Sequence, residues 1–494
     1  MKRKPITIMI QAILRTAHSL TSVFAGLVLA AILAPVSSKG DDAHAGFVFD
    51  HFQLTLEHGW RTEAAGPLYY SQQTGSNTLW AIPPFFSQER APDVESEWDH
   101  FLYPVFTKIR HGQERRWQFF ELLSVSSGVQ PDAGGVKEFT LFPVYFHQRA
   151  ADTNLNYTAV VPFYGTIKGR LFRDEIHFVM MPFYVQSRKR DVVTDNYFWP
   201  FVDVHHGDGL TGWQFWPFAG REHKDVTTQT NGFGDVSLVP GHDQRFYLWP
   251  FYLQQTNGIG AGHPESIRAS IPFFVSDHSP QRDSTTVLWP FFTTIDDRAR
   301  KYHEWQGPWP FVIWTRGEGK HTSRVWPLFS ESRNATQEND SYLWPVFTST
   351  HAHQPPLDRR RTRIAFYLYS RLVEQNTETG RQKIRVEAWP FFVWHHELNG
   401  NERLQILAPV EPAVPDNPGI EKNWSPLWSF WRSEKNPAAG ASSQSLLWNL
   451  YRRQTTPDGN NTSALFGLFQ RQSNRESAST KLFYFTVFQT PHKR

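Results

Sequence analysis

The sequence contains no cysteine, and this absence removes several classes of protein from consideration. Without thiols there can be no disulfide, no thiolate metal site and no cysteine nucleophile. Small exported domains commonly depend on disulfides for their stability. We therefore expect this chain of 494 residues to be stabilised by its size, by closure or by repetition.

Long apolar runs are missing after residue 45, and an excess of charge of one sign is missing throughout. About 17–25 apolar residues are needed to cross a bilayer as a helix, so no bundle of membrane-spanning helices is expected. The 50 Lys and Arg residues are balanced by 47 Asp and Glu residues, which leaves a formal net charge of +3. A balance of this kind gives no support to a nucleic-acid partner.

Short motifs of known catalytic sites are missing as well. The sequence has no GxSxG elbow, no HExxH helix, no phosphate-binding glycine loop and no dinucleotide fingerprint. We therefore expect that the protein is not an enzyme and that it holds no cofactor and no metal.

The first 45 residues have the form of an export signal. Lys2, Arg3, Lys4 and Arg15 supply a positive region, and an apolar stretch follows from Leu20 to Pro35. Cleavage after Ala45 would fit the preference for small residues, and an earlier site near Ser38 is an alternative. We predict a signal peptide over 1–45, or else an uncleaved anchor, followed by a single β-repeat domain over 46–494. The predicted location is the cell envelope.

Aromatic residues are abundant, and they recur at a regular spacing. They make up 15% of the chain, with 40 Phe and 20 Trp, although the mean hydropathy is −0.48. The stretch Leu288-Trp289-Pro290-Phe291-Phe292 has many copies, most of them 17 to 22 residues apart when aligned on the proline. Clear copies include Phe198-Trp199-Pro200-Phe201, Leu248-Trp249-Pro250-Phe251-Tyr252, Leu343-Trp344-Pro345-Val346-Phe347 and Ala388-Trp389-Pro390-Phe391-Phe392. Such a period indicates a repeat architecture.

Each repeat is interpreted as one β-strand with the motif at its centre. The segments between motifs carry residues that favour hairpin turns, which predicts an antiparallel meander. They are Lys168-Gly169-Arg170, Gly207-Asp208-Gly209, Gly317-Glu318-Gly319, Asn399-Gly400-Asn401 and Pro457-Asp458-Gly459-Asn460. The expected fold is all-β, an up-and-down meander of roughly twenty strands closed into a large outer-membrane-type barrel.

Two observations favour an alternative to the barrel. The motif would place apolar side chains on both faces of each strand, whereas the lumen of a wide barrel is polar. Proline within a strand cannot donate to the hydrogen-bond ladder. The alternative fold is a curved or sandwich-like β-repeat scaffold without a membrane-spanning wall.

Histidines and carboxylates are the first candidates for a chemical site. His205-His206 with Asp203 and Asp208, and the run His395-His396-Glu397, contain the residue types that bind metals. Adjacent residues on a strand point to opposite faces, so each pair offers at most one ligand to a given site. The carboxylates considered as glycosidase acids are Asp174-Glu175, Asp296-Asp297 and Glu411, but their spacing selects no pair. The histidines are interpreted as solvated side chains near hairpin turns, and the carboxylates as ordinary charges on the protein surface.

The basic run Arg359-Arg360-Arg361-Thr362-Arg363 is the remaining candidate. Arginine binds phosphate groups through its forked donors, so the run could contact acidic lipid head groups, although a solvated loop is the preferred interpretation. The tryptophans could form interface girdles, but an internal packing ladder is preferred for them.

These observations favour an exported, non-enzymatic β-repeat protein, most simply an outer-membrane barrel that acts as a pore, a transporter or a structural component. Its expected partner is then the lipid bilayer. In the alternative, a periplasmic or secreted scaffold uses aromatic surfaces to bind a carbohydrate or another envelope protein.

Overall fold

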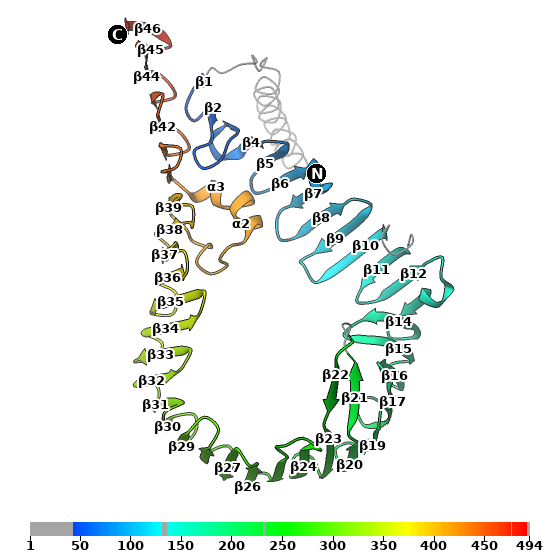
Figure 1. Cartoon of the computed structure of the whole chain (residues 1–494). Helices are drawn as coiled ribbons and strands as arrows, with labels where there is room; N and C mark the ends of the chain where they lie inside the picture. Colours follow the sequence, from blue (N-terminus) through cyan, green and yellow to red (C-terminus); the bar gives the residue numbers. More distant parts are fainter. Residues whose placement is uncertain (1–42, 131–135, 231–233, 476, 492–494) are drawn as a thin grey trace, which may run out of the picture. The chain divides into compact units, whose positions relative to one another are not determined.

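The computed structural model describes residues 43–130, 136–230, 234–475 and 477–491, which form two compact units (Figure 1). Unit 1 contains the described residues up to Ala91, Gly400–Leu407 and the chain from Pro418 onward. Unit 2 contains Pro92–Asn399 and Ala408–Asn417. The predicted signal peptide lies outside the described residues except for its last three, of which Ala43 and His44 form strand β1.

The prediction of an all-β antiparallel meander is confirmed. Each strand of unit 2 pairs antiparallel with the next one along the chain from β7 to β20, and again from β23 to β38 (Figure 1). Unit 1 contains two such runs, β1 to β6 and β39 to β46. Short hairpin connections place consecutive strands side by side, so each strand is hydrogen-bonded to the strand that follows it in the sequence.

Unit 1 has two short α-helices beside its strands. Its elements are β1 (Ala43–His44), β2 (Phe49–Gln53), β3 (Trp60–Ala64), β4 (Tyr69–Thr74), β5 (Asn77–Ile82), β6 (Phe86–Ala91), β39 (Glu402–Ile406), α2 (Pro418–Asn423), α3 (Ser425–Trp428), β40 (Trp431–Asn436), β41 (Ala441–Leu446), β42 (Tyr451–Thr456), β43 (Gly459–Ala464), β44 (Phe469–Asn474), β45 (Ser477–Leu482) and β46 (Phe485–Pro491).

Unit 2 is made almost entirely of strands. They are β7 (Ser96–Phe101), β8 (Phe106–His111), β9 (Glu114–Phe119), β10 (Leu123–Gln130), β11 (Val136–Phe142), β12 (Tyr145–Arg149), β13 (Tyr157–Val160), β14 (Tyr164–Arg170), β15 (Arg173–Val179), β16 (Tyr184–Lys189), β17 (Val192–Tyr197), β18 (Val202–Gly207), β19 (Leu210–Phe215), β20 (Ala219–Lys224), β21 (Thr227–Thr230), β22 (Val236–Val239), β23 (Gly241–Tyr247), β24 (Tyr252–Ile259), β25 (Glu265–Ser270), β26 (Phe274–His278), β27 (Arg282–Val287), β28 (Phe292–Asp297), β29 (Tyr302–Gln306), β30 (Val312–Gly317), β31 (Lys320–Val325), β32 (Phe329–Asn334), β33 (Gln337–Tyr342), β34 (Phe347–Gln354), β35 (Leu357–Ile364), β36 (Tyr369–Asn376), β37 (Gln382–Ala388) and β38 (Phe392–His396).

The interpretation of each repeat as one strand is wrong, because each repeat contributes two. The stretch Leu288-Trp289-Pro290-Phe291 is the connection between β27 and β28 rather than the centre of a strand. Two six-residue strands, this connection and a shorter polar turn together account for the observed spacing. The described residues therefore contain forty-six strands, about twice the number expected.

The motif forms a tight turn, and this explains the recurring proline. The amide of Phe291 donates to the carbonyl of Leu288 at 2.8 Å, and the Trp289–Pro290 peptide between them is cis. A cis proline at the third position defines a type VI turn. Because the proline stands in a turn, its missing N–H removes no bond from the strand ladder.

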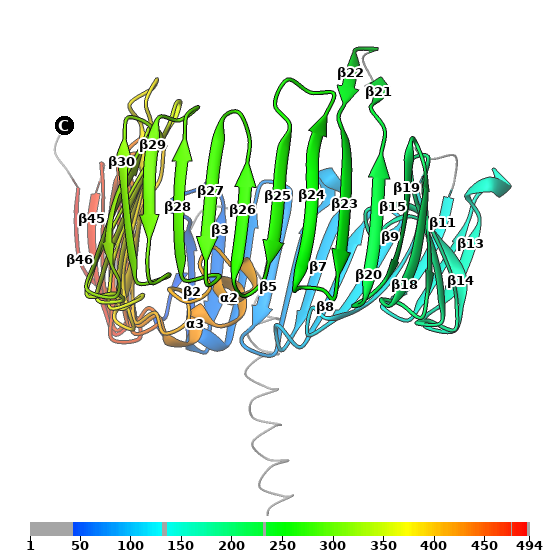
Figure 2. The same ribbon diagram turned by 90° about the horizontal axis from the view of Figure 1, so that it is seen from below.

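Successive motif turns are hydrogen-bonded to one another. The amide of Trp344 donates to the carbonyl of Pro327 at 2.7 Å, and that of Trp199 donates to Pro182 at 2.7 Å. Two strands separate one motif turn from the next, so all of the motif turns of unit 2 lie at the same rim of the sheet. Figure 2 shows this rim at the lower ends of β24 to β29, with the polar turns at the upper ends.

Closure into a barrel is not detected. Among the described residues, no backbone pairing joins β46 to β1, and the open meander fits the alternative fold. Unit 1 is sandwich-like instead, because hydrogen bonds join its first run of strands and their connections to its second run. Thr55 Oγ1 donates to Ser443 Oγ at 2.7 Å, and Gln454 Nε2 donates to the carbonyl of Gln53 at 3.0 Å.

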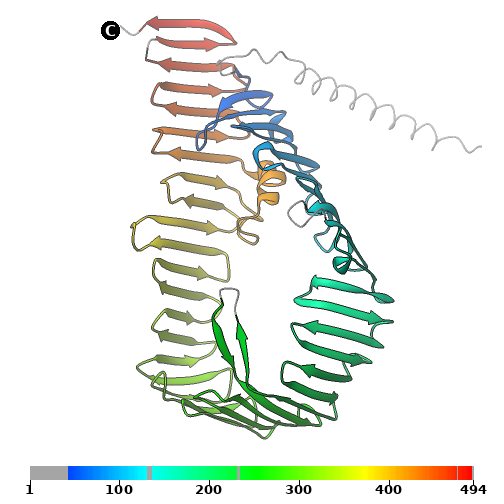
Figure 3. The same ribbon diagram turned by 45° about the vertical axis from the view of Figure 1, so that its right-hand side comes forward.

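Apolar packing inside unit 2 is concentrated near its N-terminal strands. Phe146, Ile167 and Phe178 are buried there together with three other apolar side chains, Tyr157, Ala159 and Val185. The long break in the repeat after Pro217 is explained by an inserted hairpin, β21–β22, which stands out from the sheet between β20 and β23 (Figure 3). In the part of the chain that the structure describes, no helix has the length and apolarity needed to cross a membrane.

Candidate functional site

The predicted histidine pairs lie on strands, and the members of the first pair point to opposite faces. His205 is half-buried on β18, where its Nε2 lies 2.8 Å from Asp203 Oδ1, while His206 is exposed. The hydrogen bond to Asp203 raises the pKa of His205, although partial burial opposes it. Asp208 accepts from Lys224 instead, at 3.2 Å. The first cluster is therefore a set of hydrogen-bonded pairs.

The second histidine run and the predicted carboxylates are also separated by the fold. His395 is buried on β38, and Glu397 lies 3.2 Å from Lys383 Nζ. Asp297 accepts from the amide of Arg300 at 2.7 Å. Asp174 accepts from the amide of Arg190, Asp296 lies 3.3 Å from His303 Nδ1, and Glu411 accepts from the amide of Val410 at 3.2 Å.

The tryptophans of the repeated motif in unit 2 do not form an internal ladder but lie with the other motif aromatics at one rim of that unit. We call this row the aromatic rim, and its members are between 37% and 69% exposed. It consists of Phe163, Phe183, Phe198, Trp199, Phe201, Phe218, Trp249, Phe251, Phe273, Trp289, Phe291, Trp309, Phe311, Trp344, Phe366, Tyr367, Trp389 and Phe391.

Rings of neighbouring motif turns pack against each other, and the contacts include Trp216 and Trp326, which are less exposed than the members of the aromatic rim. The ring centroids of Trp326 and Trp344 are 5.5 Å apart, and those of Trp344 and Phe366 are 5.7 Å apart. A similar contact joins Trp216 to Trp249 at 5.8 Å. Tilted and edge-to-face arrangements at these distances are favourable for aromatic pairs. The rim is therefore a row of exposed apolar rings, some of which are in contact with rings of the next turn.

Polar and charged residues are frequent in the rest of the sheet. The opposite rim carries turns such as Asp208-Gly209 and Glu318-Gly319, as the sequence predicted. Between the two rims, both faces of the strands bear charged residues. Arg360 and Arg361 are neighbours on β35 and therefore point to opposite faces.

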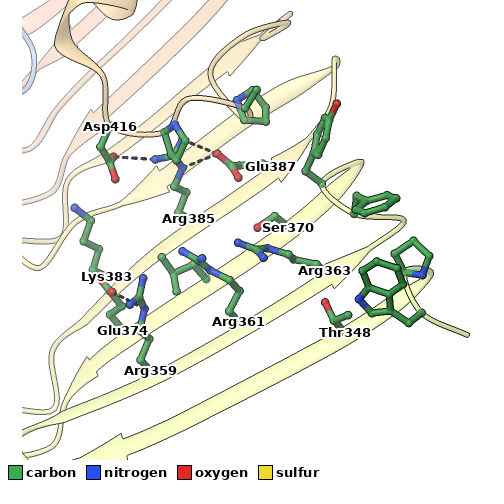
Figure 4. A pocket seen from close by; sticks show the side chains of 18 residues that line it. Thr348, Arg359, Arg361, Arg363, Ser370, Glu374, Lys383, Arg385, Glu387 and Asp416 are labelled. Atoms are coloured by element: carbon green, nitrogen blue, oxygen red, sulfur yellow. Dashed lines mark hydrogen bonds and ion pairs between the residues drawn. The ribbon is translucent and has the colours of Figure 1, made fainter. Parts of the chain in front are cut away.

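The basic run is a strand rather than the expected loop. It forms the body of β35, so Arg359, Arg361 and Arg363 share one face. They line a cleft of about 620 Å³ in unit 2, which we call the arginine cleft. Its other sides are formed by β34, β36 and β37, by residues 412–416, and by three members of the aromatic rim, Trp344, Phe366 and Tyr367. Figure 4 shows Arg361 between Arg359 and Arg363 on this face.

Some of the charged groups in the arginine cleft are paired. Arg385 is buried and lies 2.8 Å from Asp416 Oδ1, and it also bonds Glu387 through its Nε at 2.6 Å (Figure 4). Arg359 Nε lies 3.1 Å from Glu374. Burial raises the pKa of Glu387, and Arg385 opposes this effect.

The two remaining arginines have no anionic partner. Within the described residues, Arg361 and Arg363 form neither an ion pair nor a side-chain hydrogen bond, and the Nε of Arg361 is buried without an acceptor. Burial lowers the pKa of Arg361, and repulsion by Arg363 and Arg359 adds to this effect. Five cationic side chains and three carboxylates line the cleft, so its net charge is +2.

One group in the described residues has the composition and spacing of a metal site, and the sequence analysis missed it. His351 Nε2 and His353 Nδ1 lie 2.8 and 3.0 Å from the same oxygen of Asp358, across the hairpin formed by β34 and β35. Both histidines lower the pKa of Asp358, His351 the more strongly. These residues could hold a divalent cation, and the same geometry also describes a carboxylate that accepts two hydrogen bonds.

Two signals in the sequence could have revealed these groups. Residues of one type recur at every second position in both groups, the histidines at 351 and 353 and the arginines at 359, 361 and 363. This spacing places the residues of each group on one face of a strand. Arg385 and Asp416 carry no such signal, because they reach the arginine cleft from different segments. Comparison with known proteins adds no assignment, since no family model matches the chain and no curated protein is significantly similar to it.

Proposed function

We propose that the chain is an exported, non-enzymatic β-repeat scaffold that associates with the surface of a lipid bilayer through its aromatic rim. The observation that carries this proposal is the row of half-exposed Trp, Phe and Tyr side chains at one rim, opposite a rim of polar turns. The N-terminal sequence pattern supports a location in the cell envelope.

The chemistry of the rings favours a bilayer as the partner. Tryptophan and tyrosine concentrate at the boundary between lipid and water, where an apolar ring can be buried while its polar group stays hydrated. Exposed apolar side chains that gather along one edge of a protein commonly mark an interaction site. The packing of neighbouring rings holds the edge in a fixed shape, so little conformational entropy is lost when it enters the interface.

Association with the surface is better supported than a membrane-spanning wall. Six residues of strand cover only about 20 Å at roughly 3.3 Å per residue, whereas the apolar band of an outer-membrane barrel is about 25 Å tall. A lipid-facing wall also requires one apolar face. Here the charges of Arg360 and Arg361 lie on opposite faces of the same strand.

The test is flotation of the full chain, purified without detergent, with phosphatidylcholine vesicles in a density gradient. We expect the protein to float with the vesicles and its tryptophan emission to be quenched by lipids brominated near the head group. Alkaline carbonate should then release the protein, whereas a spanning barrel would resist extraction. Protein that stays at the bottom of the gradient would contradict the proposal and favour the soluble alternative, in which the rings bind a carbohydrate or another envelope protein.

A further inference from the structure

The arginine cleft combines an unsatisfied positive charge with an apolar wall. Arg361 and Arg363 lie two residues apart on one face of β35, so their backbones are separated by roughly 6.6 Å. Like charges this close destabilise each other unless a counter-charge is present. The other cationic groups of the cleft form ion pairs with protein carboxylates, whereas Arg361 is attracted by Glu387 and Glu374 without forming an ion pair. Arg363 forms no ion pair either.

Arg361 lines the cleft although its Nε is buried without an acceptor, so a ligand in the cleft would bind the terminal nitrogens of its guanidinium group. Bulk water does not reach the Nε, because it is buried. An oxyanion between Arg361 and Arg363 would accept from their terminal guanidinium nitrogens and neutralise the repulsion between the two arginines.

The two guanidinium groups favour phosphate over a single carboxylate. Each guanidinium presents donors in a planar fork that matches two oxygens of an anion. Two forks require more acceptor atoms than one carboxylate supplies, whereas the terminal oxygens of a phosphate monoester can accept from both. A phosphate monoester also carries close to two negative charges at neutral pH, which matches the net charge of +2 in the cleft.

The aromatic wall indicates that the anion belongs to an organic molecule. Trp344 and Phe366 pack together at 5.7 Å and line the cleft with Tyr367, and all three rings are more than 40% exposed. A volume of about 620 Å³ is within the range of sites for small organic ligands and is far larger than a phosphate ion alone requires.

We propose that the arginine cleft binds a phosphate monoester, with the phosphate held by Arg361 and Arg363 and the organic group against Trp344, Phe366 and Tyr367. This inference does not depend on the proposed membrane association. A lipid head group and a soluble sugar phosphate present the same chemistry to the cleft.

The test is calorimetric titration of the full chain with two monoesters, dihexanoyl phosphatidic acid and glucose 1-phosphate. Dihexanoyl phosphatidylcholine and inorganic phosphate serve as comparison probes. We expect at least one monoester to bind, more tightly than either comparison probe, and its affinity to fall as salt is added. Binding of phosphatidic acid alone would identify a lipid head group as the source, and binding of glucose 1-phosphate would identify a soluble ligand.

Arg361→Gln should weaken the binding at least tenfold. The matched control is Arg360→Gln, which removes the same charge from the same strand but on the opposite face, and we expect it to leave the affinity unchanged. Both variants should keep the circular dichroism spectrum of the parent chain. The proposal is overturned if neither monoester binds, if inorganic phosphate binds as tightly as the esters, or if the two variants lose affinity equally.

Discussion

Arg432 on β40 holds Glu63 on β3 through two hydrogen bonds, with Nη1 3.0 Å from Oε1 and Nη2 2.9 Å from Oε2. The two residues are 369 positions apart in the sequence, and Glu63 is only 6% exposed. The pair links the two runs of strands in unit 1 through a charge rather than through an apolar core. Asn449 Nδ2 donates to the same carboxylate at 2.6 Å.

Glu63→Ala should destabilise unit 1 strongly, because it leaves Arg432 without its counter-charge in the interior. Removing one partner of a buried pair typically costs about 3–5 kcal/mol. The matched control is Glu318→Ala, which removes the partner of Lys301 at 2.8 Å on the exposed rim, where little or no loss is expected. Urea unfolding measures the cost, and hydrogen exchange of β3 and β40 locates it. Equal losses in the two variants would contradict the role given to Glu63.

The same carboxylate should make stability depend on pH under acidic conditions. Burial alone would raise the pKa of Glu63, but Arg432 and Arg61 outweigh burial and hold the pKa well below its ordinary value. Because the folded pKa is depressed, the contribution of Glu63 is fully present above an unfolded pKa of about 4.3 and is lost as the pH falls below it.

Glu63→Gln isolates this effect. Burial raises the pKa of Asp50, and that group acts in the opposite direction, so the informative quantity is the difference between parent and variant. We expect the difference in urea midpoint to be largest near pH 7 and to shrink between pH 4.5 and pH 3. A difference that stays constant over this range would show that Glu63 is not charged in the folded protein.

Loss of two tryptophans from the aromatic rim should weaken vesicle binding. Trp249→Ser with Trp289→Ser removes two rings that are each 47% exposed, and partial burial of both in lipid contributes about 2 kcal/mol, or roughly 30-fold in partitioning. The control is Trp213→Ser with Trp314→Ser, two rings of similar exposure on the strand bodies. Vesicle co-sedimentation measures both, and an equal loss in the control would place the contact elsewhere.

Two glycines near the ends of strands β14 and β18 should differ sharply in their tolerance of alanine. A Cβ at Gly207 would lie 1.9 Å from the carbonyl oxygen of Asp191, whereas a Cβ at Gly169 would meet nothing within 4 Å. Both have positive φ, +118° and +62°, so Gly169→Ala should cost about 1 kcal/mol. Gly207→Ala should cost roughly 3 kcal/mol or more, because backbone must move. Thermal unfolding compares them, and similar costs would contradict the close approach at Gly207.

The all-β class and the antiparallel order of the strands could be predicted from the sequence, whereas the number of strands could not. The polar turns at Asp208-Gly209 and Glu318-Gly319 were identified by turn chemistry, which depends only on local residues. The motif around Pro290 was misplaced because β-branched and aromatic residues usually fill strand centres. A proline inside a strand would remove a donor from the hydrogen-bond ladder. This cost correctly indicates a turn at Pro290, because no ladder donor is lost there.

Some residues of the candidate sites could likewise be predicted from the sequence, and others could not. The arginines of the cleft are close in sequence, so their shared face follows from the strand period. The pairing of Arg385 with Asp416, and that of Glu63 with Arg432, depends on segments far apart in the chain. No local rule links such positions, because loop closure allows many alternative pairings at similar entropic cost.

The two-strand repeat implies that the sheet can change length in discrete steps. Each hairpin of unit 2 bonds chiefly to its two neighbours, so insertion or deletion of one whole repeat leaves every other junction intact. Each repeat contributes one motif turn, so the length of the aromatic rim is proportional to the number of repeats. Duplication of a segment of about twenty residues would lengthen that edge by one increment without any new fold being required.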